Sequence, residues 1–295
     1  MSADITTQTK STITEATQAL VNHPCRVLGV NPISAGTFEV ELQSPAGTIL
    51  NYHAGQYLQL DVDVNSDGQF QSLFYSIANG FNPDQPRRLQ LYIQNTSEFA
   101  DKILKYLSRL CEHKADVKVT MPMGQAFLQT DLELAHILAA SGSGISQIKC
   151  LTEEILKRRP NADVSIYWSN KNIDDFYLLS EFQAWASQHQ HLKFTPILAK
   201  ANLASTKLAT TNANWTGRTG YIYEVIEEDC KQLRNEDLNS TSQDPKPSKQ
   251  EYLSSTQVYL CGSPQMVYGT IDKLASIGLK EENCYSDVFE YAPRD

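Results

Sequence analysis

The sequence lacks the features that suit a membrane span or a nucleic-acid partner. Its longest apolar runs are far shorter than the roughly 20 residues that a bilayer-spanning helix needs. Lys and Arg total 25 against 34 Asp and Glu, for a formal net charge of -9. A chain with this balance has no broad basic face for phosphates or anionic lipid. We therefore expect no membrane span and no nucleic-acid partner.

Clustered cysteines and a secretory signal are also absent. The six cysteines are spread singly, without the close pairs that zinc or iron–sulfur sites require, so no metal site is predicted. Residues 1–18 are rich in Thr, Ser and Ala and lack the basic start and apolar run of a signal peptide. We expect a cytoplasmic protein in which residues 1–23 form a flexible tail.

The remaining chain is long enough for two domains, and its pattern changes near residue 131. Short alternating or β-branched runs over residues 24–130 predict an antiparallel six-stranded β-barrel. Near-continuous apolar strands alternating with amphipathic helices over residues 131–295 predict a Rossmann-like parallel sheet covered on both faces. The barrel strands are expected at 25–30, 38–42, 57–62, 73–77, 89–93 and 117–120, with one helix at 99–110. The later strands are expected at 134–140, 164–168, 194–198, 258–261 and 283–289, and the helices at 145–157, 178–187, 224–233 and 265–277.

Two polar insertions interrupt the second half, at residues 199–216 and 231–256. The second has the composition of a flexible loop. Neither is assigned any chemistry.

Glycines occupy two turns that each join a predicted strand to a helix. The first turn contains Gly142, Ser143 and Gly144, and exposed N–H groups at such a helix start favour an anion such as a dinucleotide phosphate. The third glycine of the full fingerprint is replaced by Gln147, so an ordinary tight turn is the alternative. The second turn, 261–266 (CGSPQM), also follows a buried strand. Because carboxyl ends of parallel strands share one edge, both turns are expected to border one crevice.

The barrel carries an aromatic ring beside a hydroxyl at the end of one strand, Tyr75 and Ser76. This pair can stack on a flat conjugated ring and hydrogen-bond its polar edge. Core packing of Tyr75 is the alternative interpretation.

Taken in order, these motifs resemble the ferredoxin:NADP reductase superfamily, and within it the bacterial NAD(P)H:flavin reductases of the Fre and LuxG type. The resemblance rests on 54–58 (AGQYL), 75–76 (YS), 91–94 (LYIQ), 122–127 (PMGQAF), 142–146 (GSGIS), 166–168 (IYW), 175–177 (DFY), 259–266 (YLCGSPQM) and 285–289 (YSDVF). It implies an oxidoreductase that transfers a hydride from NADH or NADPH to a flavin: FAD, FMN or riboflavin.

The resemblance also implies roles for individual residues. Tyr75 would lie against the flavin ring, and Ser76 would hydrogen-bond near its N5 as the catalytic residue. Gly142, Ser143 and Gly144 would hold the nicotinamide nucleotide's pyrophosphate, while Cys261, Gly262 and Met266 would border the nicotinamide. Cofactor binding is further implied for Leu91, Tyr92, Ile93, Gly124, Gln125 and Ile145.

One departure from the family motif concerns Leu73, where the family usually has an Arg that binds a flavin phosphate. Leucine offers no charge and no donors, which favours a flavin that exchanges as a substrate. Arg87 or Arg88 could supply the charge instead, or could be solvated turn residues. Lys171 could likewise favour NADPH, and an ordinary solvated lysine in a loop is an equally good explanation of it.

Three functional hypotheses follow. The first is a flavin reductase that delivers reduced flavin. The second is a flavoprotein that passes electrons to a ferredoxin-like protein, an oxygenase component or a ferric chelate. The third is a binding or regulatory protein without turnover.

Overall fold

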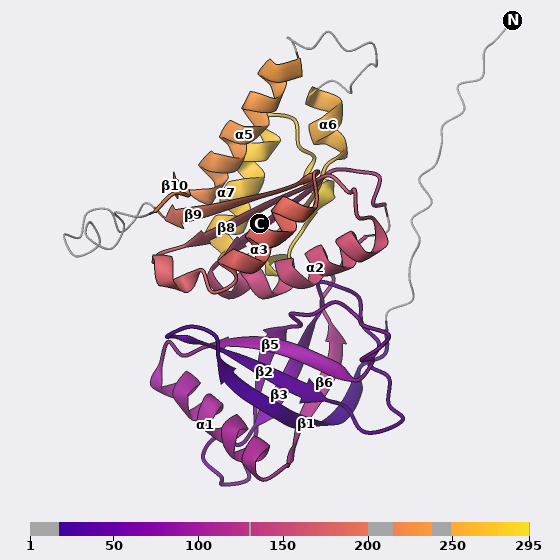
Figure 1. Cartoon of the computed structure of the whole chain (residues 1–295), viewed down its shortest axis with the longest axis vertical. Helices are drawn as coiled ribbons and strands as arrows, with labels where there is room; N and C mark the ends of the chain where they lie inside the picture. Colours follow the sequence, from indigo (N-terminus) through magenta and orange to yellow (C-terminus); the bar gives the residue numbers. More distant parts are fainter. Residues whose placement is uncertain (1–17, 130, 200–214, 238–248, 295) are drawn as a thin grey trace, which may run out of the picture.

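Two six-stranded sheets form the frame of the protein and follow one another along its long axis (Figure 1). The computed structural model describes residues 18–129, 131–199, 215–237 and 249–294. None of its helices within these ranges is long and apolar enough to cross a membrane.

The first sheet is antiparallel, with the order β4-β3-β6-β1-β2-β5. In β2, Val40 and Leu42 are buried whereas Glu39 and Glu41 are only half-buried, which is the alternation of a sheet with one face in a core. The amphipathic helix α1 starts where Ser97 Oγ accepts the N–H of Ala100, a standard N-terminal cap. The elements are β1 (Val21–Pro32), β2 (Thr37–Gln43), β3 (Tyr57–Val62), β4 (Gln71–Ser76), β5 (Arg88–Gln94), α1 (Glu98–Glu112) and β6 (Asp116–Met123).

The second sheet is parallel, with the order β10-β9-β8-β7-β11-β12. Successive residues of β7 point to opposite faces: Leu138 joins one hydrophobic cluster and Ile137 the other. Helices α2 and α3 cover the face toward the barrel, and α5 and α7 cover the far face (Figure 1). The strands are β7 (His136–Ser141), β8 (Val164–Asn170), β9 (Leu192–Ala199), β10 (Arg218–Gly220), β11 (Gln257–Cys261) and β12 (Cys284–Tyr285). The α-helices are α2 (Ile145–Arg158), α3 (Leu179–Gln188), α5 (Ile222–Asp237), α6 (Lys249–Ser255), α7 (Pro264–Ala275) and α8 (Val288–Tyr291), with 3-10 turns η1 (Gly142–Gly144), η2 (Ile173–Asp175) and η5 (Glu281–Asn283).

The predicted fold class is confirmed, but several element boundaries differ. Strand β1 begins at Val21, so residues 21–23, expected in the tail, pair with β6 instead. The expected strand at 283–289 is wrong outside Cys284–Tyr285. Asn283 belongs to the 3-10 turn η5, and after Tyr285 the chain turns into the short helix α8, where the Ser286 hydroxyl accepts the N–H of Val288. The three-residue strand β10 is too short for any periodicity to reveal.

The two insertions are only partly described. The expected loop at 231–256 is wrong at both ends, because α5 continues to Asp237 and α6 occupies Lys249–Ser255. Leu253 anchors α6 by its complete burial. Residues 238–248, and 200–214 of the other insertion, lie outside the described residues.

Candidate active site between the two sheets

An open cleft of about 480 Å³ lies between the barrel and the parallel sheet. One wall comes from β4, β5 and the start of α1, and the other from the turns that follow β7 and β11. The lining residues are Phe74, Tyr75, Ser76, Tyr92, Ile93, Gln94, Thr96, Ala100, Ser141, Ser143, Gly144, Ser146, Cys261, Gly262 and Ser263. The cleft therefore faces the carboxyl ends of parallel strands, where ligands of such sheets bind.

The two glycine turns meet, as the sequence predicted. A Cβ atom on Gly144 would come within 2.3 Å of the Cys261 carbonyl oxygen, and one on Gly262 within 2.4 Å of Ser141 Oγ. Contacts under 3.0 Å are impossible without displacement. Glycine is required at position 144, where the obstacle is backbone, whereas at 262 the obstacles are the ends of the Ser141 and Met266 side chains.

The first turn leaves backbone donors available at the cleft. Neither η1 nor α2 has a side-chain cap at its start. The first N–H groups of a helix have no partner within the helix, and they lie at the positive end of its dipole. This turn can therefore hold an anionic group such as a pyrophosphate.

The barrel wall is aromatic and neutral. Tyr75 packs partly against the barrel core, and its burial raises the pKa of its phenol to about 12. Tyr92 meets Tyr177 edge to face at 5.6 Å between ring centroids, and burial raises the pKa of Tyr92 as well. Both rings keep their protons at neutral pH, so this wall offers flat apolar surface and hydroxyl groups rather than charge.

None of the residues lining the cleft, all in the described ranges, is Lys or Arg. Arg88 is paired with Glu41, and Arg87 donates to the Ser44 carbonyl at 3.0 Å. Neither arginine lines the cleft. The start of α1 also carries acidic residues, Glu98 and Asp101, which repel a phosphate.

Several predicted site residues lie outside this cleft. Leu91 and Ile145 are completely buried in the hydrophobic core. Met266 lies behind the second turn, where its methyl group packs on Gly262. Gly142 supports the first turn with φ +56° but does not line the cleft. Gly124 and Gln125 line a separate cavity of about 260 Å³.

Asp287, a residue without a predicted role, lies at the boundary of the two halves. Burial raises the pKa of its carboxyl to about 6, and the nearby Glu290 charge adds to the rise. The carboxyl accepts a hydrogen bond from Gln147 Nε2 at 3.2 Å, and Gln147 also donates to the Gly55 carbonyl of the barrel at 2.7 Å. Asp287 together with burial raises the pKa of the Cys261 thiol to about 12, so Cys261 stays protonated.

Asp287 also lies close to the barrel at Gly124. A Cβ on Gly124 would contact both Asp287 Oδ1, at 2.9 Å, and the Tyr57 ring, at 2.8 Å. Tyr57 is the cross-strand partner of Ser76. The only sequence signal for Asp287 was its place in the motif at 285–289, because burial of a lone carboxylate depends on partners distant in the chain.

A barrel joined to a parallel sheet, with a cleft between an aromatic wall and a glycine turn, is the two-part fold of ferredoxin reductase-like proteins. Comparison with known proteins agrees. Residues 138–271 match the family described as oxidoreductase NAD-binding domain. The predicted resemblance to the ferredoxin:NADP reductase superfamily is confirmed as a resemblance of the overall fold and of the oxidoreductase NAD-binding domain.

Three relatives illustrate the similarity. An NAD(P)H-flavin reductase of Aliivibrio fischeri is 22% identical over 215 residues, covering 72% of this chain and 84% of that protein. A CDP-6-deoxy-L-threo-D-glycero-4-hexulose-3-dehydrase reductase of Yersinia pestis is 24% identical over 271 residues, covering 90% of this chain and 68% of that protein. The structure of Amycolatopsis cytochrome P450 reductase GcoB superimposes with a TM-score of 0.67 at 22% identity, covering 92% of this chain and 70% of that one.

Proposed function

We propose that the protein is an NAD(P)H-dependent flavin reductase whose cleft binds a flavin and a nicotinamide nucleotide together. The observation that carries this proposal is the placement of Tyr75 and Ser76 across one cleft from Gly144 and Cys261. Relatives named NAD(P)H-flavin reductase support it. The bound nucleotide and flavin supply the chemistry, a hydride transfer between their rings.

The residues of the chain position the reactants and exclude water. Tyr75 offers its ring face to the flavin, and Ser76 offers a hydroxyl to the flavin's polar edge. The N–H groups at Ser143 and Gly144 bind the pyrophosphate of the nucleotide. Asp287, with a pKa near neutrality, is suited to hold or release a proton at the boundary of the two halves.

The flavin is held as an exchangeable substrate, recognised through its ring rather than its phosphate. The cleft fits a flat ring, but among its lining residues there is no cation for a phosphate. Oxidation of NADH and NADPH by the desalted protein, with riboflavin, FMN or FAD added, tests this. We expect saturable stimulation by all three flavins, with riboflavin no weaker than FMN.

The substitution Leu73→Arg tests phosphate recognition directly, and Leu73→Gln is its uncharged control. Because Leu73 lies two residues before Tyr75 on the same strand face, an arginine there can reach along the wall and bind a phosphate. We expect the KM for FMN to fall about tenfold, with little change for riboflavin. Stoichiometric flavin retained through dialysis, with rates indifferent to added flavin, would contradict exchange.

A second candidate function is electron delivery to a separate protein. Phe74 lines the cleft yet is 60% exposed, and Phe70, directly before the same strand, is 62% exposed. Exposed aromatic side chains beside a cleft mark a contact surface. The terephthalate 1,2-dioxygenase reductase component of Comamonas, 23% identical over 256 residues, has a name that fits this role. Activity only with an artificial acceptor, without stimulation by free flavin, would favour it.

The proposal also covers organisation and location. We assign flavin binding to residues 24–130 and nucleotide binding to residues 131–295, with Lys171, exposed directly after β8, available to an adenosine phosphate. A cytoplasmic location is supported by six free cysteines, since reduced thiols persist there. Cell fractionation, and kcat/KM for NADH against NADPH, test these assignments.

A further inference from the structure

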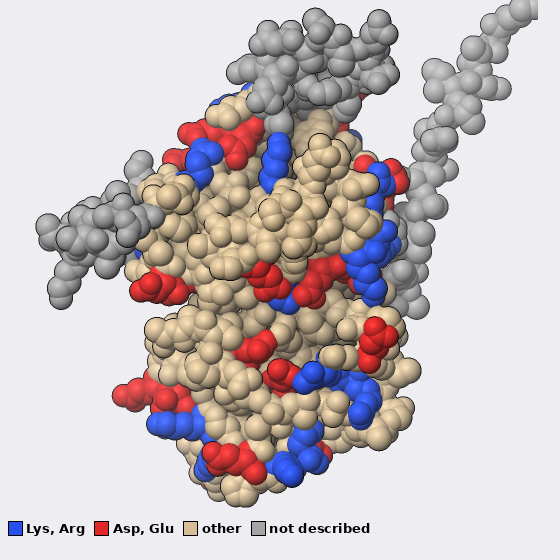
Figure 2. Space-filling view, viewed as in Figure 1, with Lys and Arg blue, Asp and Glu red and all other residues tan. Residues whose placement is uncertain are grey.

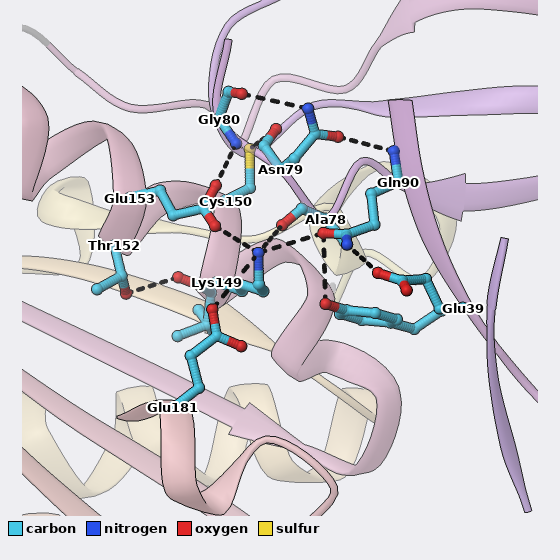
Figure 3. A network of polar contacts seen from close by, with 12 residues as sticks. Glu39, Ala78, Asn79, Gly80, Gln90, Lys149, Cys150, Thr152, Glu153 and Glu181 are labelled. Atoms are coloured by element: carbon cyan, nitrogen blue, oxygen red, sulfur yellow. Dashed lines mark hydrogen bonds and ion pairs between the residues drawn. The ribbon is translucent and has the colours of Figure 1, made fainter. Parts of the chain in front are cut away.

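A lysine is buried where the barrel meets the parallel sheet. Lys149 lies in the second turn of α2, and its side chain is only 6% exposed. Its ammonium group donates to the Ala78 carbonyl at 3.4 Å and to Gln90 Oε1 at 3.2 Å, both in the barrel (Figure 3). It also pairs with Glu153 on α2 and, at 3.8 Å, with Glu181 on α3. One cation thus joins the barrel to two helices.

Lys149 and its barrel partners lie in segments that continue into the two walls of the cleft. Ala78 comes two residues after Ser76, and Gln90 is two residues before Tyr92 on β5. On the opposite side, Lys149 is five residues beyond Gly144 on the helix that the first glycine turn begins. The contacts of Lys149 therefore connect segments that carry the barrel wall of the cleft to the helix that carries the first glycine turn.

Further hydrogen bonds hold this group of residues in one arrangement. Glu153 Oε2 accepts the N–H of Gly80 at 2.7 Å, and the Cys150 thiol donates to the Asn79 carbonyl at 3.0 Å. Asn79 Oδ1 accepts the N–H of Gln90 at 2.7 Å. Figure 3 shows these side chains converging from α2 and from the barrel on Lys149. Each partner of the ammonium group is itself fixed by a second bond or by the helix that carries it.

We propose that Lys149 is a positioning residue, which sets the distance and angle between the flavin wall at Ser76 and the nucleotide turn at Gly144. This inference rests on the proposed function, because its consequence is the alignment of two ring systems. An apolar contact would hold the halves together as well as a buried ion pair does, since burial of the ions offsets most of their attraction. Directional hydrogen bonds, unlike apolar contacts, fix a single geometry. That geometry matters because hydride transfer is sensitive to misplacement of the reacting atoms.

The test compares Lys149→Met with Lys157→Met as the matched control. Lys157 lies on the same helix and also reaches the barrel, donating to the Phe81 carbonyl at 2.8 Å, but its side chain is 49% exposed and away from the cleft. We expect Lys149→Met to lower kcat about 10- to 100-fold, with the KM values for nicotinamide nucleotide and riboflavin nearly unchanged. Lys157→Met should keep kcat within about twofold, and Lys149→Arg should recover part of the loss.

Two further measurements separate positioning from general damage. With NADH deuterated at the transferred position, the isotope effect on kcat should grow in Lys149→Met, because hydride transfer becomes slower than the other steps. Hydrogen exchange at the amide of Gly80, which is held by Glu153, should accelerate in Lys149→Met and not in Lys157→Met. If Lys149→Met does not fold, Glu153→Gln replaces it, since it weakens the same ion pair while keeping an acceptor for Gly80.

An unchanged kcat in both Lys149→Met and Glu153→Gln would overturn the proposal, as would equal losses in the Lys149 and Lys157 variants. If the unmodified protein oxidises no NAD(P)H with any acceptor, the proposed function has failed instead. The exchange rate at Gly80 then still decides whether Lys149 joins the two halves. The two failures are therefore distinguishable.

Discussion

At the scale of single residues, Asp287 has a titratable carboxyl that is largely buried, so that its ionisation costs free energy. Its folded-state pKa of about 6 lies above the ordinary value of 3.8, because burial disfavours the ionised form. By linkage, the stability that this group contributes is fully present below pH 3.8 and is lost as the pH rises through 6. The loss of folding free energy amounts to about 1–3 kcal/mol, and the lower value applies to the extent that the side chain is exposed to solvent.

Replacement of Asp287 by Asn should remove this dependence. We expect the melting temperature of Asp287→Asn, relative to the unmodified protein, to rise between pH 4 and pH 7 and to level off above. Calorimetry across this range measures the difference, with the exposed Asp84→Asn as a control that leaves the profile unchanged. A parallel pair of profiles for the unmodified protein and Asp287→Asn would show that the carboxyl is already ionised without cost in the folded state.

At the scale of elements, the contact between the two glycine turns determines whether β7 and β11 can form one edge of the cleft. Gly144 has a helical φ of -57°, so alanine meets no backbone strain there. Its Cβ would nevertheless lie 2.3 Å from the Cys261 carbonyl oxygen, which belongs to backbone and cannot rotate away. Gly144→Ala must therefore push the two turns apart.

We expect Gly144→Ala to lower the free energy of unfolding by about 1–3 kcal/mol and to raise the KM for the nicotinamide nucleotide more than that for riboflavin. Urea denaturation and steady-state kinetics measure the two effects. Gly36→Ala is the matched control, because a Cβ at Gly36 meets nothing within 4 Å. Equal KM increases for both substrates would indicate that the turn supports the whole cleft rather than the nucleotide.

Most strands and helices were predictable because they carry their own periodicity, as β2 does in alternating Val40 and Leu42 with half-buried glutamates. The short elements β10, α6 and α8 carry none that is long enough to recognise. The turns at Gly144 and Gly262 were predictable because a strand, a glycine and a helix follow one another in the chain. Lys149 and Asp287 were not, since a charged residue becomes buried only through partners from distant segments. The extent of α5 was also missed, because its last turns are polar and no apolar stripe marks them.

At the scale of the whole molecule, the two halves share one of the two hydrophobic clusters. The same cluster of buried side chains contains Leu42 and Leu91 from the barrel and Leu151 and Phe182 from α2 and α3. Charged side chains are scattered in small groups over the visible face, and acidic ones follow the boundary between the halves (Figure 2). The predicted boundary at residues 130 and 131 falls between β6 and β7.

A shared core predicts that the halves unfold together, although chains of this size often unfold domain by domain. We expect one calorimetric transition with a ratio of calorimetric to van't Hoff enthalpy near one. Riboflavin at 100 times its Kd should stabilise this single transition by about 2.7 kcal/mol, because it binds only the folded cleft. Two transitions, with riboflavin shifting only the transition of the barrel, would contradict this expectation. They would mean that the interface fixes the relative placement of the halves but does not couple their free energies of unfolding. In that case alignment of the two rings would depend on directional bonds such as those of Lys149 rather than on the shared core.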